Sequence, residues 1–125
     1  MIAMLATLIL TLTNAYAATP LTSAAEVKAA FAKGRPMVIM FSAEWCPACK
    51  WTKPQYLEAE KQFAGKVDFY TMDTDKIGLK MKKQFSGIPA FVAGHNEKEI
   101  RSGKSLMEGG MPVFEIVKYV KQWTN

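Results

Sequence analysis

Both cysteines of the chain, Cys46 and Cys49, lie in one short segment with Pro47 and Ala48 between them. A structural zinc site needs four ligands, and the chain offers two thiols and one distant imidazole, His95, so we expect no metal. A structural disulfide is the second possibility, but so short a ring contributes only about 2 kcal/mol, against about 3 kcal/mol for a 15-residue loop. The spacing therefore favours a redox-active pair that opens and closes during thiol–disulfide exchange.

The residues around the pair give each sulfur a role. Cys46 precedes an expected helix, where free backbone amides and the positive end of the helix dipole favour the thiolate, so we expect it to be the nucleophile. Pro47 suits the first helical position because its missing N–H costs nothing there. Cys49 lies one turn further on and can attack the mixed disulfide that Cys46 forms with a substrate. Trp45 is expected to shield the pair.

Elements that position the cysteines are expected on both sides of them. Ser23 and Glu26 have the spacing of a capping box, which predicts a short first helix. The continuous apolar run 36–41 is typical of a central strand buried on both faces. This strand leads into the cysteines and then into a helix over residues 47–63, in which Pro54 predicts a kink.

The second half of the chain continues the alternation of strand and helix. A strand over residues 67–72 precedes a helix that starts at residues 73–75. Residues 90–93 and 99–102 flank a Gly-His-Asn-Glu sequence and are predicted to form a hairpin of two antiparallel strands. A closing amphipathic helix is expected to have Pro112 at its first position. This order predicts one α/β unit.

The first 17 residues predict export. They carry no charged side chain, are mainly apolar and end in Ala15-Tyr16-Ala17, the small-x-small pattern of a secretory signal. We expect cleavage after Ala17, which leaves a single domain over residues 18–125 in the periplasm or outside the cell. A membrane anchor that stays uncleaved is the alternative, although threonines interrupt the stretch before it reaches the roughly 20 apolar residues that span a bilayer.

Composition narrows the classes of partner. The formal net charge is +5, but the basic residues are spread along the chain rather than clustered, so we expect no nucleic-acid binding and at most a weak preference for acidic partners. Methionines at strand and helix spacing are typical of core filling rather than copper binding. We therefore assign neither metal nor cofactor and expect a monomer.

Residues 41–50, Phe-Ser-Ala-Glu-Trp-Cys-Pro-Ala-Cys-Lys, resemble the active-site segment of thioredoxins. Pro54 stands where that family has its helix-kinking proline, and Gly87-Ile88-Pro89 resembles the loop that carries the family's cis-proline. The resemblance covers about residues 22–124. It implies a thioredoxin-like three-layer α/β fold, with a central mixed sheet of about four to five strands flanked by helices.

The resemblance also implies how a substrate binds. A cis Ile88–Pro89 bond would face the cysteines, and the backbone around Ile88 would pair with an extended substrate strand. The expected substrate-binding residues are therefore Trp45, Pro47, Ala48, Ile88 and Pro89.

Three departures from the thioredoxin pattern change the expected chemistry. Met40 stands where thioredoxins have a buried Asp beneath the second cysteine, so water, Glu44 or another nearby carboxylate must take the Cys49 proton. Thr71 and Ser42 replace the family's buried Lys and the aromatic before the motif. Pro-Ala replaces Gly-Pro between the cysteines, and without a histidine there we expect a reduction potential between the reducing and oxidising extremes.

The sequence thus predicts a thiol–disulfide oxidoreductase that acts on exported proteins and leans toward reduction. A reductant outside the cytoplasm needs an electron donor, for which a membrane dithiol protein is the expected partner. The alternatives are a disulfide oxidase or isomerase, and a chaperone-like binding module that uses the cis-proline groove.

Overall fold

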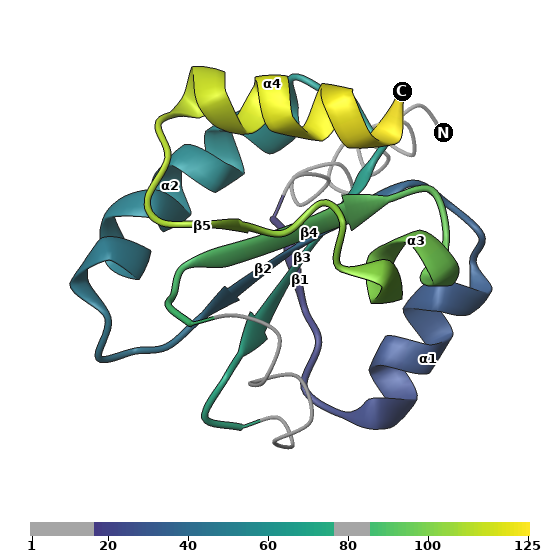
Figure 1. The fold of residues 1–125 in the computed structure, drawn as a ribbon, viewed down its shortest axis with the longest axis horizontal. Coiled ribbons are helices and arrows are strands. Elements are labelled where there is room, and N and C mark those ends of the chain that lie inside the picture. The colour runs from purple at the N-terminus through teal and green to yellow at the C-terminus, as the bar shows by residue number, and fades with distance from the viewer. Residues whose placement is uncertain (1–16, 77–85) are drawn as a thin grey trace, which may run out of the picture.

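The computed structural model describes residues 17–76 and 86–125, and within these ranges the chain forms one mixed sheet with helices on both sides (Figure 1). The strands are β1 (Thr19–Pro20), β2 (Met37–Ser42), β3 (Asp68–Asp73), β4 (Ala90–Gly94) and β5 (Met107–Glu108). The helices are α1 (Ala24–Ala32), α2 (Pro47–Lys61), α3 (Glu97–Ser102) and α4 (Val113–Thr124).

The sheet has the order β1-β3-β2-β4-β5, which places β2 at its centre. β1 and β2 both pair parallel to β3, whereas β4 pairs antiparallel to β2 and to β5. The side chains of Met37 to Phe41 are at most 3% exposed, so the strand before the cysteines is buried on both faces, as its apolar run predicts. The expected three-layer mixed sheet is confirmed.

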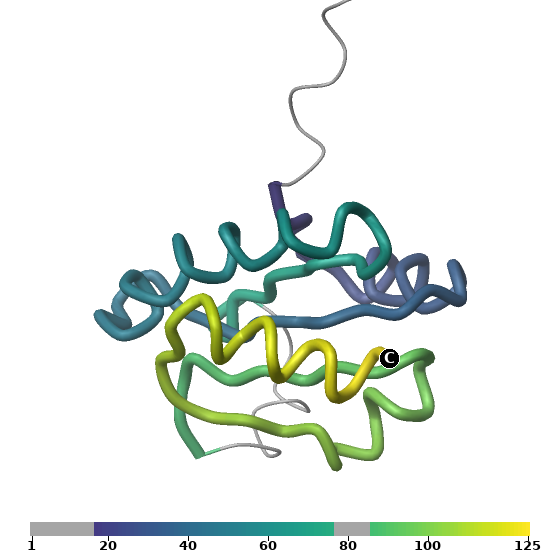
Figure 2. Tube along the Cα trace, turned by 90° about the horizontal axis from the view of Figure 1, so that it is seen from above, coloured from purple at the N-terminus to yellow at the C-terminus, as the bar shows by residue number. Residues whose placement is uncertain are grey.

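Each face of the sheet has its own apolar core. On one face, Val38 and Met40 of β2 pack with Tyr56 of α2 and Ile116 of α4. On the other, β2 contributes Ile39 and Phe41, which pack with residues of α1 and α3. The two views agree that α2 and α4 lie side by side over their face (Figures 1 and 2). Alternate residues of one strand therefore hold both layers of helices.

Local capping fixes where α1 begins. The Ser23 hydroxyl accepts a hydrogen bond from the backbone N–H of Glu26 at 3.1 Å, as the capping box predicts. The Glu26 carboxylate accepts from the N–H of Thr22 at 2.7 Å rather than from Ser23 itself. The sequence did not predict the short strand β1, which precedes α1 at the edge of the sheet.

The predicted hairpin is wrong in its second arm. β4 forms as expected, but residues 97–102 are the helix α3, and the antiparallel neighbour of β4 is β5. The Asn96 side chain accepts from the N–H of Glu99 at 3.0 Å, and the Glu99 carboxylate accepts from the N–H of His95 at 2.7 Å. This reciprocal cap starts a helix, and burial of Ile100 holds it against the sheet.

Smaller differences concern element ends. Residues 74–76 form a turn after β3, and the helix expected from residues 73–75 onward otherwise lies outside the described residues. Pro112 is the N-cap residue of α4, one position before the first helical position that the sequence predicts for it. Pro54 lies inside α2 as expected. In the described ranges, no helix has the length and apolar character needed to cross a membrane.

Candidate active site

A disulfide joins Cys46 and Cys49 at the start of α2, with 5.2 Å between their Cα atoms. Cys46 is the N-cap residue, and its sulfur accepts a hydrogen bond from the backbone N–H of Cys49 at 3.1 Å. Pro47 occupies the first helical position as predicted. In the reduced pair, this N–H and the helix dipole would stabilise a thiolate on Cys46 rather than on Cys49.

The disulfide lies just beneath the surface. Cys46 and Cys49 are 4% and 3% exposed and pack against Ala43 and Ile88. Pro47 and Ala48, which separate the cysteines, are exposed. Pro47 and Ala48 are therefore accessible surface residues beside the buried sulfurs.

Trp45 is a large exposed side chain directly before the disulfide. Its side chain is 65% exposed, and its indole N–H donates to a carboxylate oxygen of Asp75 at 2.8 Å. This hydrogen bond ties the ring to the turn that follows β3. The polar edge of Trp45 is thus satisfied, while most of its side chain is exposed.

The loop before β4 brings Ile88 and Pro89 to the cysteines. The Ile88–Pro89 peptide bond is cis, as the resemblance implies. The carbonyl oxygen of Ile88 lies 3.6 Å from the Cys46 sulfur, although the two residues are 42 positions apart. The carbonyl of Pro89 accepts from the N–H of Gly109 at 2.8 Å, which fixes the loop against the chain after β5. The structure therefore places both cysteines beside the predicted cis-proline loop.

The Thioredoxin family model matches residues 18–122, which include all of these features. The chain belongs to the thioredoxin family. Thioredoxin-1 of Saccharomyces cerevisiae is 32% identical over 79 residues, which are 62% of this chain and 76% of the yeast protein. The thioredoxin of Borreliella burgdorferi is 41% identical over 46 residues, or 37% of this chain and 39% of that protein.

Solved thioredoxins share the fold. The Malassezia sympodialis thioredoxin superposes with a TM-score of 0.72 at 24% identity, covering 86% of this chain and 91% of that one. The Plasmodium falciparum thioredoxin gives a TM-score of 0.71 at 23% identity, covering 84% and 98%. With the family and the cysteine pair established, this thioredoxin-family chain is a thiol–disulfide oxidoreductase.

This site differs from the thioredoxin pattern at Met40, which stands where that pattern has a buried Asp. The Met40 side chain is fully buried in the core between the sheet and the layer of α2 and α4. A thioether cannot accept a proton from a thiol at neutral pH. Cys49 therefore has no proton acceptor at residue 40, the position that holds a carboxylate in the thioredoxin pattern.

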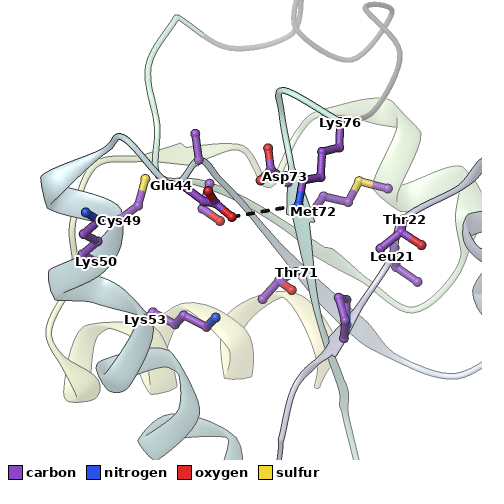
Figure 3. Close-up of a pocket in the computed structure, with 13 residues that line it drawn as sticks. Leu21, Thr22, Glu44, Cys49, Lys50, Lys53, Thr71, Met72, Asp73 and Lys76 are labelled. Atoms are coloured by element: carbon purple, nitrogen blue, oxygen red, sulfur yellow. Dashed lines mark ion pairs between the residues drawn. The ribbon is translucent and has the colours of Figure 1, made fainter.

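An open cavity of about 440 Å³ reaches Cys49 from the side of β3 (Figure 3). Its charged lining residues are Glu44, Lys50, Lys53, Asp73 and Lys76. Thr71 lies on its wall, so the position of the family's buried Lys faces open space. Solvent can thus approach the second cysteine of this thioredoxin-family chain.

The two carboxylates of this cavity differ in position. Glu44 is directed toward Lys76, whose Nζ lies 3.9 Å from Oε1, and both side chains are well exposed (Figure 3). Asp73 ends β3, and its Oδ1 accepts from the N–H of Asp75 at 2.8 Å. Sequence reasoning named Glu44 but did not name Asp73. Its position at the carboxyl end of a strand parallel to β2 was the available signal.

Among the described residues, no group of three or more histidine, cysteine, aspartate or glutamate side chains is arranged to hold a metal ion.

Proposed function

We propose that this oxidoreductase reduces disulfides of exported proteins, with Cys46 as the attacking and Cys49 as the resolving residue. The observation that carries the assignment is the N-cap position of Cys46, whose sulfur already accepts the N–H of Cys49 at 3.1 Å. Cys49 lies inside the first turn of α2 and lines the side cavity.

The exchange proceeds in two displacements. The Cys46 thiolate attacks one sulfur of the substrate disulfide, forms a mixed disulfide and expels the other substrate sulfur as a thiolate. The Cys49 thiolate then attacks the Cys46 sulfur, which releases the second substrate thiolate and closes the Cys46–Cys49 disulfide. The substrate gains two electrons and the protein loses two. A dithiol donor must return them, and we propose a membrane dithiol protein for this step.

Cys49 must lose a proton before the second displacement. Since Met40 cannot accept it, we propose that the proton leaves into the cavity, to water held near Asp73. Asp73 suits this role better than Glu44 because Asp73 is half-buried, whereas the Glu44 side chain is 87% exposed. The two carboxylates can be tested separately by removing their charges one at a time.

The substrate would bind across the exposed surface around the disulfide. Its extended chain would lie along Ile88 and Pro89 and contact Trp45, Pro47 and Ala48. The exposure of the Trp45 ring and the 3.6 Å approach of the Ile88 carbonyl to Cys46 support this placement. The mode is addition of a substrate strand to the protein backbone.

Export would follow from cleavage between Ala17 and Ala18. The family match begins at residue 18, and the described helices and strands all lie after Ala17, which supports this processing. Protein recovered from the periplasm or the medium is expected to begin at Ala18 by intact mass. Recovery of the full-length chain in membranes would contradict cleavage and support an anchored form.

The reduction potential of the cysteine pair tests the direction of electron flow. We expect a value nearer to about −270 mV, as in reducing thioredoxins, than to about −120 mV, as in strong oxidases. Equilibration with glutathione and the fluorescence of the neighbouring Trp45 give the measurement. A value near the oxidising limit would overturn reduction and favour the oxidase alternative.

A further inference from the structure

Glu60 is a nearly buried carboxylate far from the redox site. It lies in the last turn of α2, and its residue is 8% exposed. Its Oε1 accepts a hydrogen bond from the backbone nitrogen of Ala18 at 3.0 Å, directly before β1. Among the described residues, no lysine, arginine or histidine forms an ion pair with Glu60. A buried carboxylate without a cation is costly to ionise.

The surroundings of this carboxylate disfavour its charge. Ala18 packs in the same apolar core as Phe63, Val67 and Phe69. Glu60 also lies at the carboxyl-terminal end of α2, where the helix dipole is negative. Burial raises the pKa of Glu60, and the Ala18 hydrogen bond offsets part of the rise.

Ala18 itself has an unusual backbone. Its φ is +25°, a value that an L-alanine rarely adopts, and it is buried although Ala17 beside it is exposed. The steric limit on φ comes from the carbonyl of the preceding residue. If Ala18 were the first residue of the chain, that carbonyl would be absent and the restriction would disappear.

We propose that cleavage after Ala17 supplies the missing cation, so that the new α-ammonium of Ala18 becomes the buried counter-ion of Glu60. The inference rests on the processing proposed above. The nitrogen that now donates one N–H at 3.0 Å would carry a positive charge and three donors at the same place. Processing thereby completes an ion pair that the precursor lacks.

The ion pair would hold β1 against the sheet. Thr19 and Pro20 pair with Tyr70 and Thr71 of β3, and the N–H of Leu21 donates to the Thr71 carbonyl at 2.8 Å. Residues 20–22 then form part of the wall of the cavity that reaches Cys49. Fixing Ala18 thus positions a segment that continues to the redox site.

Other titratable groups surround Glu60 and must be separated from the effect. Lys33, Asp68 and Tyr70 line a cavity of about 140 Å³ together with Glu60, and Tyr56 lies one turn earlier on α2. Asp68 is already paired with Arg35 at 3.0 Å. Lys33 is therefore the one lysine or arginine of this cavity lining that could replace the α-ammonium.

The test titrates the α-ammonium of protein released from a fusion so that it begins at Ala18. Residues 18–125 contain every described helix and strand. We expect its pKa, followed by NMR, to lie at least about one unit above the ordinary 7.7–8.0, a tenfold tighter hold on the proton. The shift should disappear in Glu60→Gln and persist in Glu58→Gln, whose carboxylate is exposed on the same helix. An ordinary pKa in the unmodified protein would overturn the proposal.

Unfolding measurements give a second test that does not need the Glu60 variant to fold. Acetylation of the α-amine, or retention of Tyr16 and Ala17, should lower the unfolding midpoint of the unmodified sequence, and Lys33→Gln should not. Equal midpoints for the free and the acetylated protein would contradict the ion pair. Where Glu60→Gln folds, the effect of acetylation should vanish in it.

Failure of this inference is distinguishable from failure of the proposed function. A protein that begins at Ala18 with an unshifted α-ammonium but exchanges disulfides would refute the ion pair alone. A protein with the shifted α-ammonium but no exchange would refute the redox proposal and support the ion pair.

Discussion

The two ends of α2 each bury a group that can ionise, but the chain builds them in opposite ways. At the amino-terminal end, Cys46 receives an N–H from Cys49, three residues away, and the positive end of the helix dipole. At the carboxyl-terminal end, Glu60 meets the negative end of the dipole, and its hydrogen bond comes from Ala18, 42 residues away. The first environment favours the anion, and the second disfavours it until a cation arrives.

The difference shows how one helix can carry two kinds of site. A thiolate at the N-cap is stabilised by groups that the helix itself provides, so a short motif suffices. A carboxylate at the other end depends on a distant segment to supply its partner. The stabilisation at the first end is therefore local, whereas the ion pair proposed for the second end requires cleavage after Ala17.

The largest expected effect is at the first end. Cys46→Ser should lower the rate of disulfide exchange by more than about 10³-fold, because a serine hydroxyl is not ionised at neutral pH and cannot form the mixed disulfide. An insulin-reduction assay measures the loss. Cys49→Ser is the matched control for stability, since both variants lose the same disulfide. Equal single-turnover rates of attack for the two variants would contradict the assignment of Cys46.

The next effect concerns the cavity beside the same end. Asp73→Asn should slow closure of the Cys46–Cys49 disulfide about tenfold at neutral pH, since water alone must then take the Cys49 proton. Asparagine keeps the oxygen that accepts the Asp75 N–H. Stopped-flow Trp fluorescence across pH separates this from a folding defect, because the deficit should shrink as pH rises. Glu44→Gln serves as the control, and an equal loss there would remove Asp73 from the account.

At the carboxyl-terminal end of α2, the pH dependence of the free energy of unfolding tests the environment of Glu60. In a chain that retains Ala17, the raised pKa of Glu60 means that the folded state binds more protons than the unfolded state between about pH 4.3 and the folded pKa. The free energy of unfolding should therefore fall as pH rises from 4.3 through the folded pKa, by at most about 1.4 kcal/mol per pH unit. Glu60→Gln should remove this decline.

The chain that retains Ala17 and its Glu60→Gln variant share all other carboxylates. The difference between their free energies of unfolding therefore excludes the titration of those groups. The tyrosines near Glu60 do not titrate in this range, because burial raises the pKa values of Tyr56 and Tyr70 above 10. Parallel urea denaturation curves between pH 4 and pH 8 measure the difference. A decline that is the same in both proteins would show that Glu60 is not its source.

The smallest expected effect is on the free energy of unfolding and concerns Thr52, which lies between the two ends of α2. Thr52 is fully buried, and its hydroxyl is the buried side-chain oxygen without a hydrogen-bond partner in the described part of the chain. Thr52→Val should raise the free energy of unfolding by about 1 kcal/mol, because it removes an unsatisfied polar group at constant shape. Thr74→Val is the control and should be destabilising, since the Thr74 hydroxyl donates to the Ser42 carbonyl. A loss of stability in Thr52→Val would imply a partner for that hydroxyl.

The cysteine site was predictable from sequence because its determinants are local. The apolar run before Cys46, the proline after it and the two-residue spacing each correspond to a feature of strand, N-cap or first turn. The cis Ile88–Pro89 bond was predictable only through the family resemblance, since nothing local distinguishes this proline from one in an edge strand.

The remaining features depend on contacts between distant segments. β1 is two residues long and forms because Thr19 and Pro20 pair with β3. So short a strand has no sequence periodicity from which it could be predicted. The cavity at Cys49 requires α2, β3 and the segment after β1 together. The error at α3 is different, because Asn96 and Glu99 are a local helix start that the glycine and asparagine of the expected turn obscured.

Cys46 is proposed to attack the substrate disulfide, and Cys49 to resolve the mixed disulfide. The most direct measurement incubates Cys49→Ser and Cys46→Ser with a disulfide-bonded substrate protein at neutral pH and maps the adducts by mass spectrometry. We expect a stable mixed disulfide on Cys46 in the first variant and little or none on Cys49 in the second, because the N-cap sulfur accepts the Cys49 N–H and lies 3.6 Å from the Ile88 carbonyl. Adducts that form on Cys49 as fast as on Cys46 would contradict this assignment.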